Sequence, residues 1–326
     1  MTTSPPLSGT AAPLLDTYLA LLLDLDGVVY LDAQPVPHAP DTLRAARDRG
    51  TKIEFVTNNA AHTPADVVAR LIRLGVDAAE DEVVTSSMAA ADLLRAEWPA
   101  GSAVLVVGGA GLWSAVTAAG LRPMRVAAAD DMPVAVVQGW GPDVAWADLA
   151  EATVALRAGA RWVATNLDRT LPSPRGPLPG SGSLVAAVQA ATGRSPDAVA
   201  GKPYPPLLAA ARARINTGPA LVVGDRLDTD IAGATAAGLP SLLVLTGVSG
   251  PRDLLAAPPE QRPTYVGRDL TALFAAQPAV DRDGTVHRSD GNDDGLDELR
   301  GLAARAWSGQ LSDEQYDAAV SALDLS

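Results

Sequence analysis

The stretch Leu21-Leu-Leu-Asp-Leu-Asp-Gly-Val-Val-Tyr30 decides the fold that this chain is expected to adopt. An apolar run ends at Asp24, and a second carboxylate, Asp26, follows two positions later. Such a run is typical of a strand buried on both faces of a parallel sheet. Two carboxylates beyond a buried strand repel each other and lose hydration, and a divalent cation removes both costs. Hard oxygen ligands suit Mg²⁺, and Gly27 allows a sharp turn beside the ion. A solvated turn is the alternative that this segment alone leaves open.

Short apolar runs alternate with helical periodicity along most of the chain. The expected strands cover residues 19–23, 53–56, 104–107, 134–137, 162–164, 221–223 and 242–245. The expected helices cover residues 41–49, 64–74, 88–98, 111–119, 148–158, 182–191, 206–215 and 229–237, with two more at 296–307 and 312–323. This alternation predicts an α/β fold with mostly parallel sheets. The residues before about Leu14 are rich in Pro, Ser and Thr and are expected to form a loose arm.

Polar side chains follow the expected strands at the points where ligands bind in such folds. Ligands lie outside the carboxyl ends of the strands, so these residues belong at one edge of the sheet. Thr57 ends the second strand and is followed by Asn58 and Asn59, which offer donors for phosphoryl oxygens. Asp225 follows the strand at 221–223, in an acidic segment that includes Asp230. In isolation, ordinary loop residues and an acidic helix cap explain these segments equally well.

Lysine is rare in this chain, which has only Lys52 and Lys202. Lys202 lies in Gly201-Lys-Pro203 at the start of a helical segment, where the helix dipole disfavours a positive charge. A bound anion would reverse that balance, although a solvated surface lysine is the alternative.

Composition excludes several classes of site. At 326 residues the chain has room for two domains, and 48% hydrophobic residues are typical of a globular protein. The absence of cysteine excludes disulfides, thiolate nucleophiles and cysteine-ligated zinc. A net charge of −13 repels nucleic acid and anionic membranes. The first apolar run is too short for a bilayer, which needs ~20 residues, and no secretory signal precedes it. We therefore expect no membrane insertion, no nucleic-acid partner and a cytoplasmic location.

Taken together, the segments around Asp24, Thr57, Lys202 and Asp225 resemble the signature motifs of the haloacid dehalogenase (HAD) superfamily. The segments Val136-Val-Gln-Gly-Trp140 and Gly180-Ser-Gly-Ser-Leu-Val185 look like its NagD-like, p-nitrophenylphosphatase branch (class IIA). The resemblance implies an α/β protein with a Rossmann-like parallel-sheet core and a large inserted α/β cap. The implied divisions are core at 14–86 and 199–278, cap at 87–198 and an appended C-terminal segment at 279–326.

The resemblance also implies roles for individual residues. Asp24 attacks phosphorus and becomes an aspartyl phosphate, and Asp26 protonates the leaving group and then activates water. Thr57 and Lys202 bind the transferring phosphoryl oxygens. Mg²⁺ is held by Asp24, the main-chain carbonyl of Asp26, and Asp225.

Four further residues have lesser implied roles. Asn58 and Asn59 line the phosphate pocket, Gly27 supports the metal site, and Asp230 supports either the water shell of the metal or Lys202.

The implied function is Mg²⁺-dependent hydrolysis of a small phosphomonoester. The composition and the C-terminal segment look like those of bacterial members that hydrolyse glycerol phosphate, so glycerol 3-phosphate is the expected substrate. Phosphoglycolate, pyridoxal phosphate and nucleotides are the alternatives. A non-catalytic phospho-accepting or binding module is the alternative from another class. Caps of this type often dimerise, which leaves a homodimer formed through the cap open, and the role of residues 279–326 stays open as well.

Overall fold

The computed structural model describes residues 7–171, 173, 175–215, 218–288 and 294–323, which form two compact units. The first unit takes in the described residues of Met1–Phe55, Ile72–Asp77 and Arg212–Ser326. The second takes in those of Val56–Leu71 and Ala78–Ala211. The division into core, cap and appended segment that the sequence suggests has other boundaries and stays a prediction.

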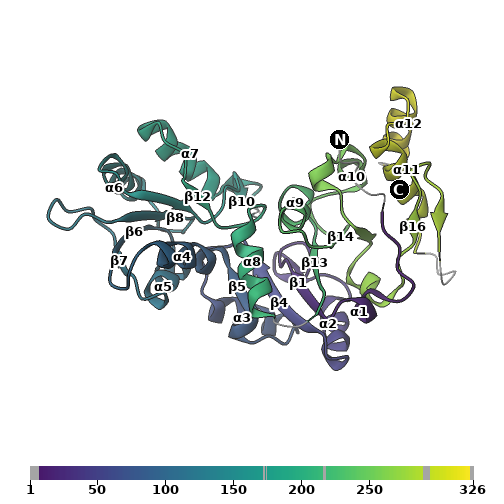
Figure 1. Ribbon diagram of the computed structural model, residues 1–326, viewed down its shortest axis with the longest axis horizontal. Coiled ribbons are helices and arrows are strands. Elements are labelled where there is room, and N and C mark those ends of the chain that lie inside the picture. Colours follow the sequence, from purple (N-terminus) through teal and green to yellow (C-terminus); the bar gives the residue numbers. More distant parts are fainter. Residues whose placement is uncertain (1–6, 172, 174, 216–217, 289–293, 324–326) are drawn as a thin grey trace. The chain divides into compact units, whose positions relative to one another are not determined.

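A parallel sheet forms the centre of the first unit, with its strands in the order β15-β14-β13-β1-β4 (Figure 1). These strands are β1 (Ala20–Leu23), β4 (Lys52–Thr57), β13 (Ala220–Gly224), β14 (Ser241–Val244) and β15 (Tyr265–Gly267). Leu21 is paired with Ile53 on one side and with Leu221 on the other. All of β1 is buried, as its uninterrupted apolar sequence predicts. Asp24 therefore follows the central strand of this sheet.

Short helices and one small hairpin lie before, between and after these strands in the sequence. They are α1 (Leu14–Thr17), β2 (Tyr30–Leu31), β3 (Gln34–Pro35), α2 (Ala39–Asp48), α9 (Ala232–Ala236), α10 (Pro251–Ala256), the 3₁₀ turns η3 (Pro259–Gln261) and η4 (Leu270–Phe274), and a π-helical segment, η2 (Leu227–Ile231). The helix expected at 229–237 is thus divided, because a π-helical turn occupies its beginning. Such turns are frequent at functional sites.

The residues before α1 are packed rather than loose. Leu7 is buried, Ser8 N–H donates to the Thr264 carbonyl, and Thr10 N–H donates to the Gln277 carbonyl. The prediction of a loose arm is wrong for residues 7–13, because distant segments supply backbone partners that composition does not reveal. Residues 1–6 lie outside the described residues.

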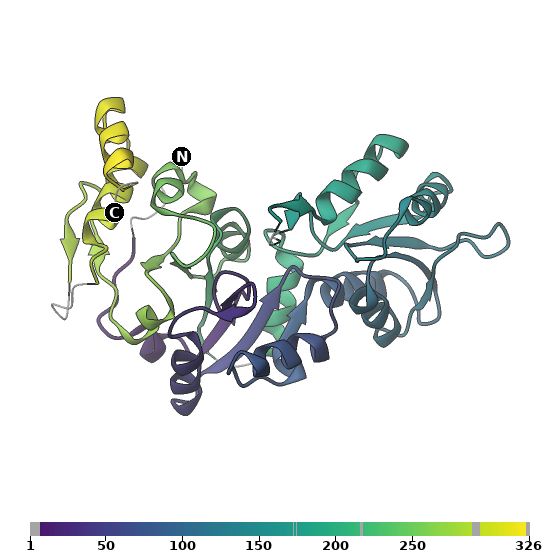
Figure 2. The ribbon, with the colours of Figure 1, turned by 180° about the vertical axis from the view of Figure 1, so that it is seen from behind.

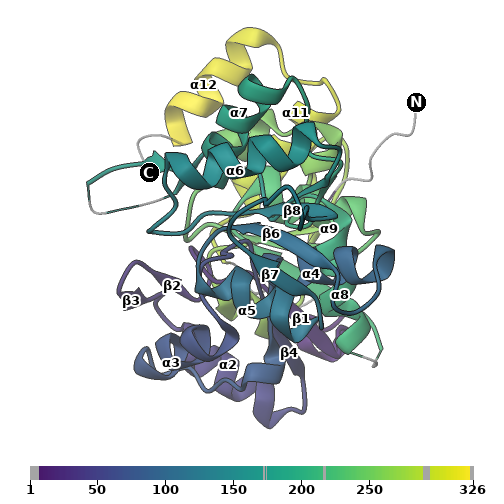
Figure 3. The same cartoon turned by 90° about the vertical axis from the view of Figure 1, so that its left-hand side faces the viewer.

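A second parallel sheet forms the centre of the second unit, in the order β12-β9-β8-β6-β7. Its strands are β6 (Ala103–Val107), β7 (Arg122–Met124), β8 (Ala135–Gln138), β9 (Arg161–Ala164) and β12 (Ala198–Val199). The helices α6 (Trp146–Arg157) and α7 (Ser181–Thr192) cover one face, and α4 (Ser86–Glu97) and α5 (Ala110–Ala118) cover the other (Figures 1 and 3). At its centre, the fully buried Trp162 donates its Nε1–H to Gln138 Oε1 at 3.1 Å.

The second unit contains further elements outside that sheet. They are α3 (Pro64–Arg73), the 3₁₀ turn η1 (Glu80–Glu82), β5 (Val83–Thr85), the antiparallel pair β10 (Thr170–Leu171) and β11 (Leu178–Pro179), and α8 (Pro205–Arg214). The pair β10–β11 lies in the Pro- and Gly-rich part of the chain.

The C-terminal part begins with a small hairpin, β16 (Ala279–Val280) and β17 (Val286–His287), against which a helix packs (Figure 2). That helix is α11 (Asp297–Trp307), and α12 (Asp313–Leu323) follows it. The two helices predicted for this part are confirmed to within one residue at each end.

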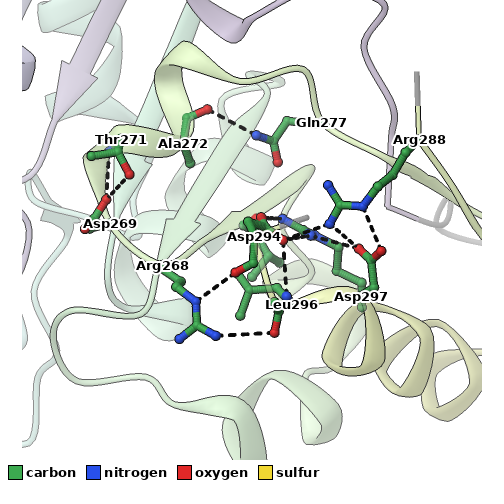
Figure 4. A network of polar contacts seen from close by, with 12 residues as sticks. Arg268, Asp269, Thr271, Ala272, Gln277, Arg288, Asp294, Leu296 and Asp297 are labelled. Carbon is green, nitrogen blue, oxygen red and sulfur yellow. Dashed lines mark hydrogen bonds and ion pairs between the residues drawn. The ribbon is translucent and has the colours of Figure 1, made fainter. Parts of the chain in front are cut away.

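An ion-pair network of Arg288, Asp294, Asp297 and Arg300 stabilises this C-terminal part. Arg300, which is 1% exposed, binds Asp294 with 2.7 Å between its Nη1 and Asp294 Oδ1, and Arg288 binds both Asp294 and Asp297 (Figure 4). Burial raises the pKa of Asp294, but its hydrogen bonds and charge interactions with Arg300 and Arg288 outweigh this and lower the pKa from 3.8 to about 2.

Acid is therefore expected to weaken this part of the fold. Because the pKa of Asp294 is lower in the folded chain, its contribution is complete above about pH 5 and is lost as the pH falls towards 2. Allowing for solvent screening, the loss is about 1–2 kcal/mol. Urea unfolding between pH 6 and pH 3 measures it, and Asp294→Asn should flatten the decline. If the free energy of unfolding of Asp294→Asn fell equally steeply with pH, Asp294 would not be the group responsible.

Among the described helices, none combines the length and the hydropathy needed to cross a membrane.

Candidate active site

Three carboxylates meet at the carboxyl end of the first unit's sheet. Asp24, Asp225 and Asp230 each present a carboxylate oxygen within 4.8 Å of the other two. Asp225 and Asp230 are each only 1% exposed, and Asp24 is partly buried. Three negative charges at this spacing and burial repel one another strongly unless a cation or protons compensate them.

The strands explain why these side chains meet. Asp24 N–H donates to the Val223 carbonyl at 2.9 Å, which continues the pairing of β1 with β13 by one residue. Asp225 follows β13, so the two acids leave neighbouring parallel strands side by side. Asp230 lies in η2, and its Oδ2 accepts the Arg226 N–H at 3.1 Å.

Glycines make room for the carboxylates. Gly27 has a φ of +84°, and a Cβ there would collide with the carboxylate of Asp225. A Cβ on Gly247 would strike the same carboxylate, and one on Gly224 would strike Asp230. The acids therefore lie directly against main chain on several sides.

A loop that the sequence predictions missed holds Asp225 in place. Val248 N–H donates to Asp225 Oδ2 at 2.7 Å, and Ser249 N–H donates to its main-chain carbonyl at 3.0 Å. The Thr246 hydroxyl donates to the Gly27 carbonyl, which joins this loop to the turn after β1. The signal was present, because residues 246–249 follow an expected strand just as Asp24 and Asp225 do. We refer to residues 246–249 as the Asp225 loop.

Asp26 lies apart from this acidic group. Its side chain is exposed, and the Tyr30 hydroxyl lies 3.5 Å from its Oδ2. Its exposure and its position two residues after Asp24 are compatible with proton transfer, a role that stays a prediction. The binding of a metal by the Asp26 main-chain carbonyl stays a prediction.

The acidic group fits a magnesium ion. All three donors are carboxylate oxygens, the hard ligands that Mg²⁺ prefers, and main chain closes over Asp225. Asp230 was expected only in a supporting role, but its carboxylate oxygen lies within 4.8 Å of those of Asp24 and Asp225, so it is a candidate ligand like them.

A second group of predicted residues lies in the second unit, around Lys202. Its side chain is only 3% exposed, and its Nζ donates to the Val56 carbonyl at 3.0 Å. Thr57, also 3% exposed, accepts the Asn59 N–H on its Oγ1 at 3.0 Å, which leaves the hydroxyl proton able to donate elsewhere. A buried ammonium bound to the residue before Thr57, together with a donor hydroxyl on Thr57, suits the binding of an anion.

Asn58 joins the segments of this second group. Its Oδ1 accepts the Lys202 N–H at 2.8 Å, and its Nδ2 donates to the Lys202 carbonyl at 2.9 Å and to Asp168 Oδ2 at 3.1 Å. Its carbonyl accepts a hydrogen bond from Asn166 Nδ2 at 2.8 Å. Asn58 thus fixes Lys202 beside the end of β4, whereas direct contacts of Asn58 and of the exposed Asn59 with phosphate stay predictions.

Family models match two parts of the chain. A model described as haloacid dehalogenase-like hydrolase matches residues 21–122, and a HAD-hydrolase-like model matches residues 199–273. The first match includes Asp24 and Thr57, and the second includes Lys202 and Asp225.

Similar proteins extend the match over most of the chain. A D-glycerol 3-phosphate phosphatase of Mycobacterium tuberculosis is 47% identical over 312 residues, which cover 90% of this chain and 87% of the relative. An acid sugar phosphatase of Staphylococcus aureus is 36% identical over 79% of this chain and 97% of its own length.

Solved structures agree with these matches. A glycerol phosphate phosphatase of M. tuberculosis, crystallised with magnesium, has a TM-score of 0.84 at 45% identity and covers 96% of this chain and 99% of its own. A p-nitrophenyl phosphatase of Archaeoglobus fulgidus has a TM-score of 0.72 at 30% identity, covering 79% of this chain and 98% of its own.

Proposed function

Because the chain belongs to the haloacid dehalogenase-like hydrolases, we propose that its acidic cluster serves a Mg²⁺-dependent phosphatase. The observation that carries the proposal is the meeting of Asp24, Asp225 and Asp230 at one end of a parallel sheet. Their donors are of the kind that Mg²⁺ prefers, and a bound Mg²⁺ would supply charge neutralisation for these carboxylates and for a phosphoryl group.

We assign the covalent step to Asp24. Its carboxylate attacks phosphorus, the bond from phosphorus to the ester oxygen breaks, and an aspartyl phosphate forms. Asp26 gives its proton to the departing oxygen and then takes one from the water that hydrolyses the intermediate. The exposed Asp26 side chain, two residues beyond Asp24, supports this division of roles.

We assign the binding of the phosphoryl oxygens to Lys202 and Thr57. The hydrogen bond from Lys202 Nζ to the carbonyl of Val56, the residue before Thr57, supports this, because it brings the ammonium to the segment that carries the Thr57 hydroxyl. A fixed ammonium and a hydroxyl stabilise charge as it develops without having to reorganise during the reaction. Lys202 is suited to this because Asn58 already holds its main chain on both sides.

We propose glycerol 3-phosphate as the substrate. The similarity to the mycobacterial D-glycerol 3-phosphate phosphatase covers 90% of this chain, whereas the similarity to the acid sugar phosphatase covers 79%.

The resemblance seen in the sequence supports a homodimer formed through the cap. The cysteine-free composition is compatible with a cytoplasmic location.

A phosphomonoester panel tests these assignments. We expect kcat/KM to be highest for glycerol 3-phosphate when it is compared with phosphoglycolate, pyridoxal 5′-phosphate, a nucleotide and a sugar phosphate. A chelator should stop turnover, and added Mg²⁺ should restore it, because three acids would otherwise repel the anionic substrate.

Each adverse result removes a different part of the proposal. A clear preference for another ester would overturn the substrate, and full activity with chelator would overturn the role of the metal. Phosphorylation of the protein without turnover would favour a phospho-accepting module instead.

A further inference from the structure

The C-terminal helices share one apolar cluster with the part of the fold that carries the metal ligands. Leu254 and Leu255 of α10, Leu299 and Ala303 of α11, and Val320 of α12 are all buried in it. Two residues of the π-helical segment η2, Leu227 and Ile231, belong to the same cluster. The C-terminal segment is therefore continuous with the packing behind Asp225 and Asp230.

A direct link joins α11 to α10. Trp307 donates its Nε1–H to the Leu254 carbonyl at 2.9 Å, and the guanidinium of Arg262 stacks on the same ring at 5.3 Å. Both α11 and α12 pack against α10, which has only six residues. A helix this short depends on its tertiary contacts for stability.

The next link joins α10 to the metal ligand. Only Gly250 separates α10 from the Asp225 loop, in which Val248 N–H and Ser249 N–H bind Asp225. The Ser249 hydroxyl also accepts the Leu227 N–H at 3.0 Å, so the loop fixes the start of η2 as well. A shift of α10 would therefore move the groups that orient the Asp225 carboxylate.

The ion-pair network around Asp294 also links the C-terminal segment to the first unit's sheet, at β15. Arg300 donates to the Val266 carbonyl in β15, and Arg268, just beyond β15, donates to the carbonyls of Asp294 and Gly295 (Figure 4). The strand β15 is paired with β14, which leads into the Asp225 loop. The C-terminal segment is thus anchored both beside this loop and on the strand next to β14.

We propose that the C-terminal segment is a positioning element for the metal site: through Trp307 and α10 it fixes the Asp225 loop and so sets the affinity for Mg²⁺. Trp307 acts through Leu254 and the loop and makes no contact with substrate or metal in this role. The inference rests on the proposed Mg²⁺-dependent function and gives residues 279–326 a part in it.

Paired tryptophan variants of the full chain test the inference. Loss of groups that orient metal ligands costs about 10- to 100-fold in metal affinity, and at the low end of that range we expect about tenfold weaker Mg²⁺ binding in Trp307→Ala. Trp307→Phe keeps a six-membered ring for packing but loses the N–H and the second ring of the indole, so we expect Mg²⁺ binding to weaken by about threefold, less than in Trp307→Ala. Calorimetric titration with Mg²⁺ measures the binding without turnover, and kcat at saturating Mg²⁺ should stay close to that of the unchanged protein.

Amide exchange in the metal-free protein supplies a second readout. We expect faster exchange at Val248 and Ser249 in both Trp307 variants, because their hydrogen bonds to Asp225 open more often. The matched control is Trp162→Phe, which loses one buried indole hydrogen bond in the second unit. It should lower the thermal midpoint but change neither the Mg²⁺ affinity nor exchange in the Asp225 loop.

The outcomes separate this inference from the proposed function. Unaltered Mg²⁺ affinity and loop exchange in Trp307→Ala, or in Trp307→Phe if the alanine variant does not fold, would overturn the positioning role alone. Equal weakening of Mg²⁺ binding by Trp162→Phe would overturn it too, because general destabilisation would then explain the effect. Unchanged protein that neither binds Mg²⁺ nor hydrolyses phosphomonoesters would overturn the proposed function itself.

Discussion

Asp24→Asn is expected to lower kcat by about 10⁴-fold or more, since an amide is a far weaker nucleophile than a carboxylate. The substitution keeps the size of the side chain and reduces the charge of the acidic cluster by one. Folding should therefore be preserved, and the loss should appear in kcat with glycerol 3-phosphate at saturating Mg²⁺. Asp24→Ala serves as a second variant, because an asparagine can revert slowly to aspartate by deamidation.

The control for Asp24→Asn is Asp228→Asn. Asp228 is another acid of the same unit, but it is 57% exposed and is paired with Arg226 at the surface. Its substitution should leave kcat within about twofold, as exposed ion pairs contribute little. Acid quenching during turnover should trap a hydroxylamine-sensitive phosphoryl group on the unchanged protein and none on Asp24→Ala. Normal turnover by both Asp24 variants would exclude the covalent mechanism.

Lys202→Met is expected to lower kcat/KM by about 10²- to 10³-fold, in the range seen when a preorganised donor to developing charge is removed. Methionine fills a similar volume but carries no charge and no donor. The main-chain bonds of residue 202 to Asn58 do not depend on the side chain, so the local fold should persist. Steady-state kinetics with glycerol 3-phosphate measures the loss.

The chain supplies its own control, because it contains only one other lysine. Lys52 is exposed on β4, and Lys52→Met removes the same charge from the protein as a whole. If net charge alone mattered, the two variants would behave alike. Nearly normal kcat/KM in Lys202→Met, or an equal loss in Lys52→Met, would rule out a specific role for Lys202.

Uninterrupted apolar runs made the central strands predictable from sequence. The run that ends at Leu23 became β1, and the rule that ligands lie beyond the carboxyl ends of parallel strands led to Asp24 and Asp225. Short strands such as β12 and β15 were not predicted, since two or three residues carry too little periodicity. Their position depends on the neighbouring strand with which they pair.

The supporting contacts of the site were beyond sequence patterns. That Asn58 lines the phosphate pocket stays a prediction, whereas the contacts of its amide with the main chain of Lys202 and the carboxylate of Asp168 were not foreseen. The position of Val248 and Ser249 beyond an expected strand was visible, but their residue types do not show that they bind Asp225, because every residue except proline has a backbone N–H. Trp307 gave no hint of its partner, because a tryptophan in an amphipathic helix is as compatible with ordinary core packing.

The pairing of Leu21 with Leu221 has a consequence for co-translational folding. β1 is made early, but the strand that flanks it on one side, together with Asp225, emerges only after the whole second unit has been synthesised. Until β13 has been made, the apolar edge of β1 that pairs with it stays exposed. Exposed apolar strand edges are the kind of surface that nascent-chain chaperones recognise. The second unit, whose central sheet is made of strands close together in sequence, is free to fold first, and the metal site can form only after Asp225 and Asp230 have been made.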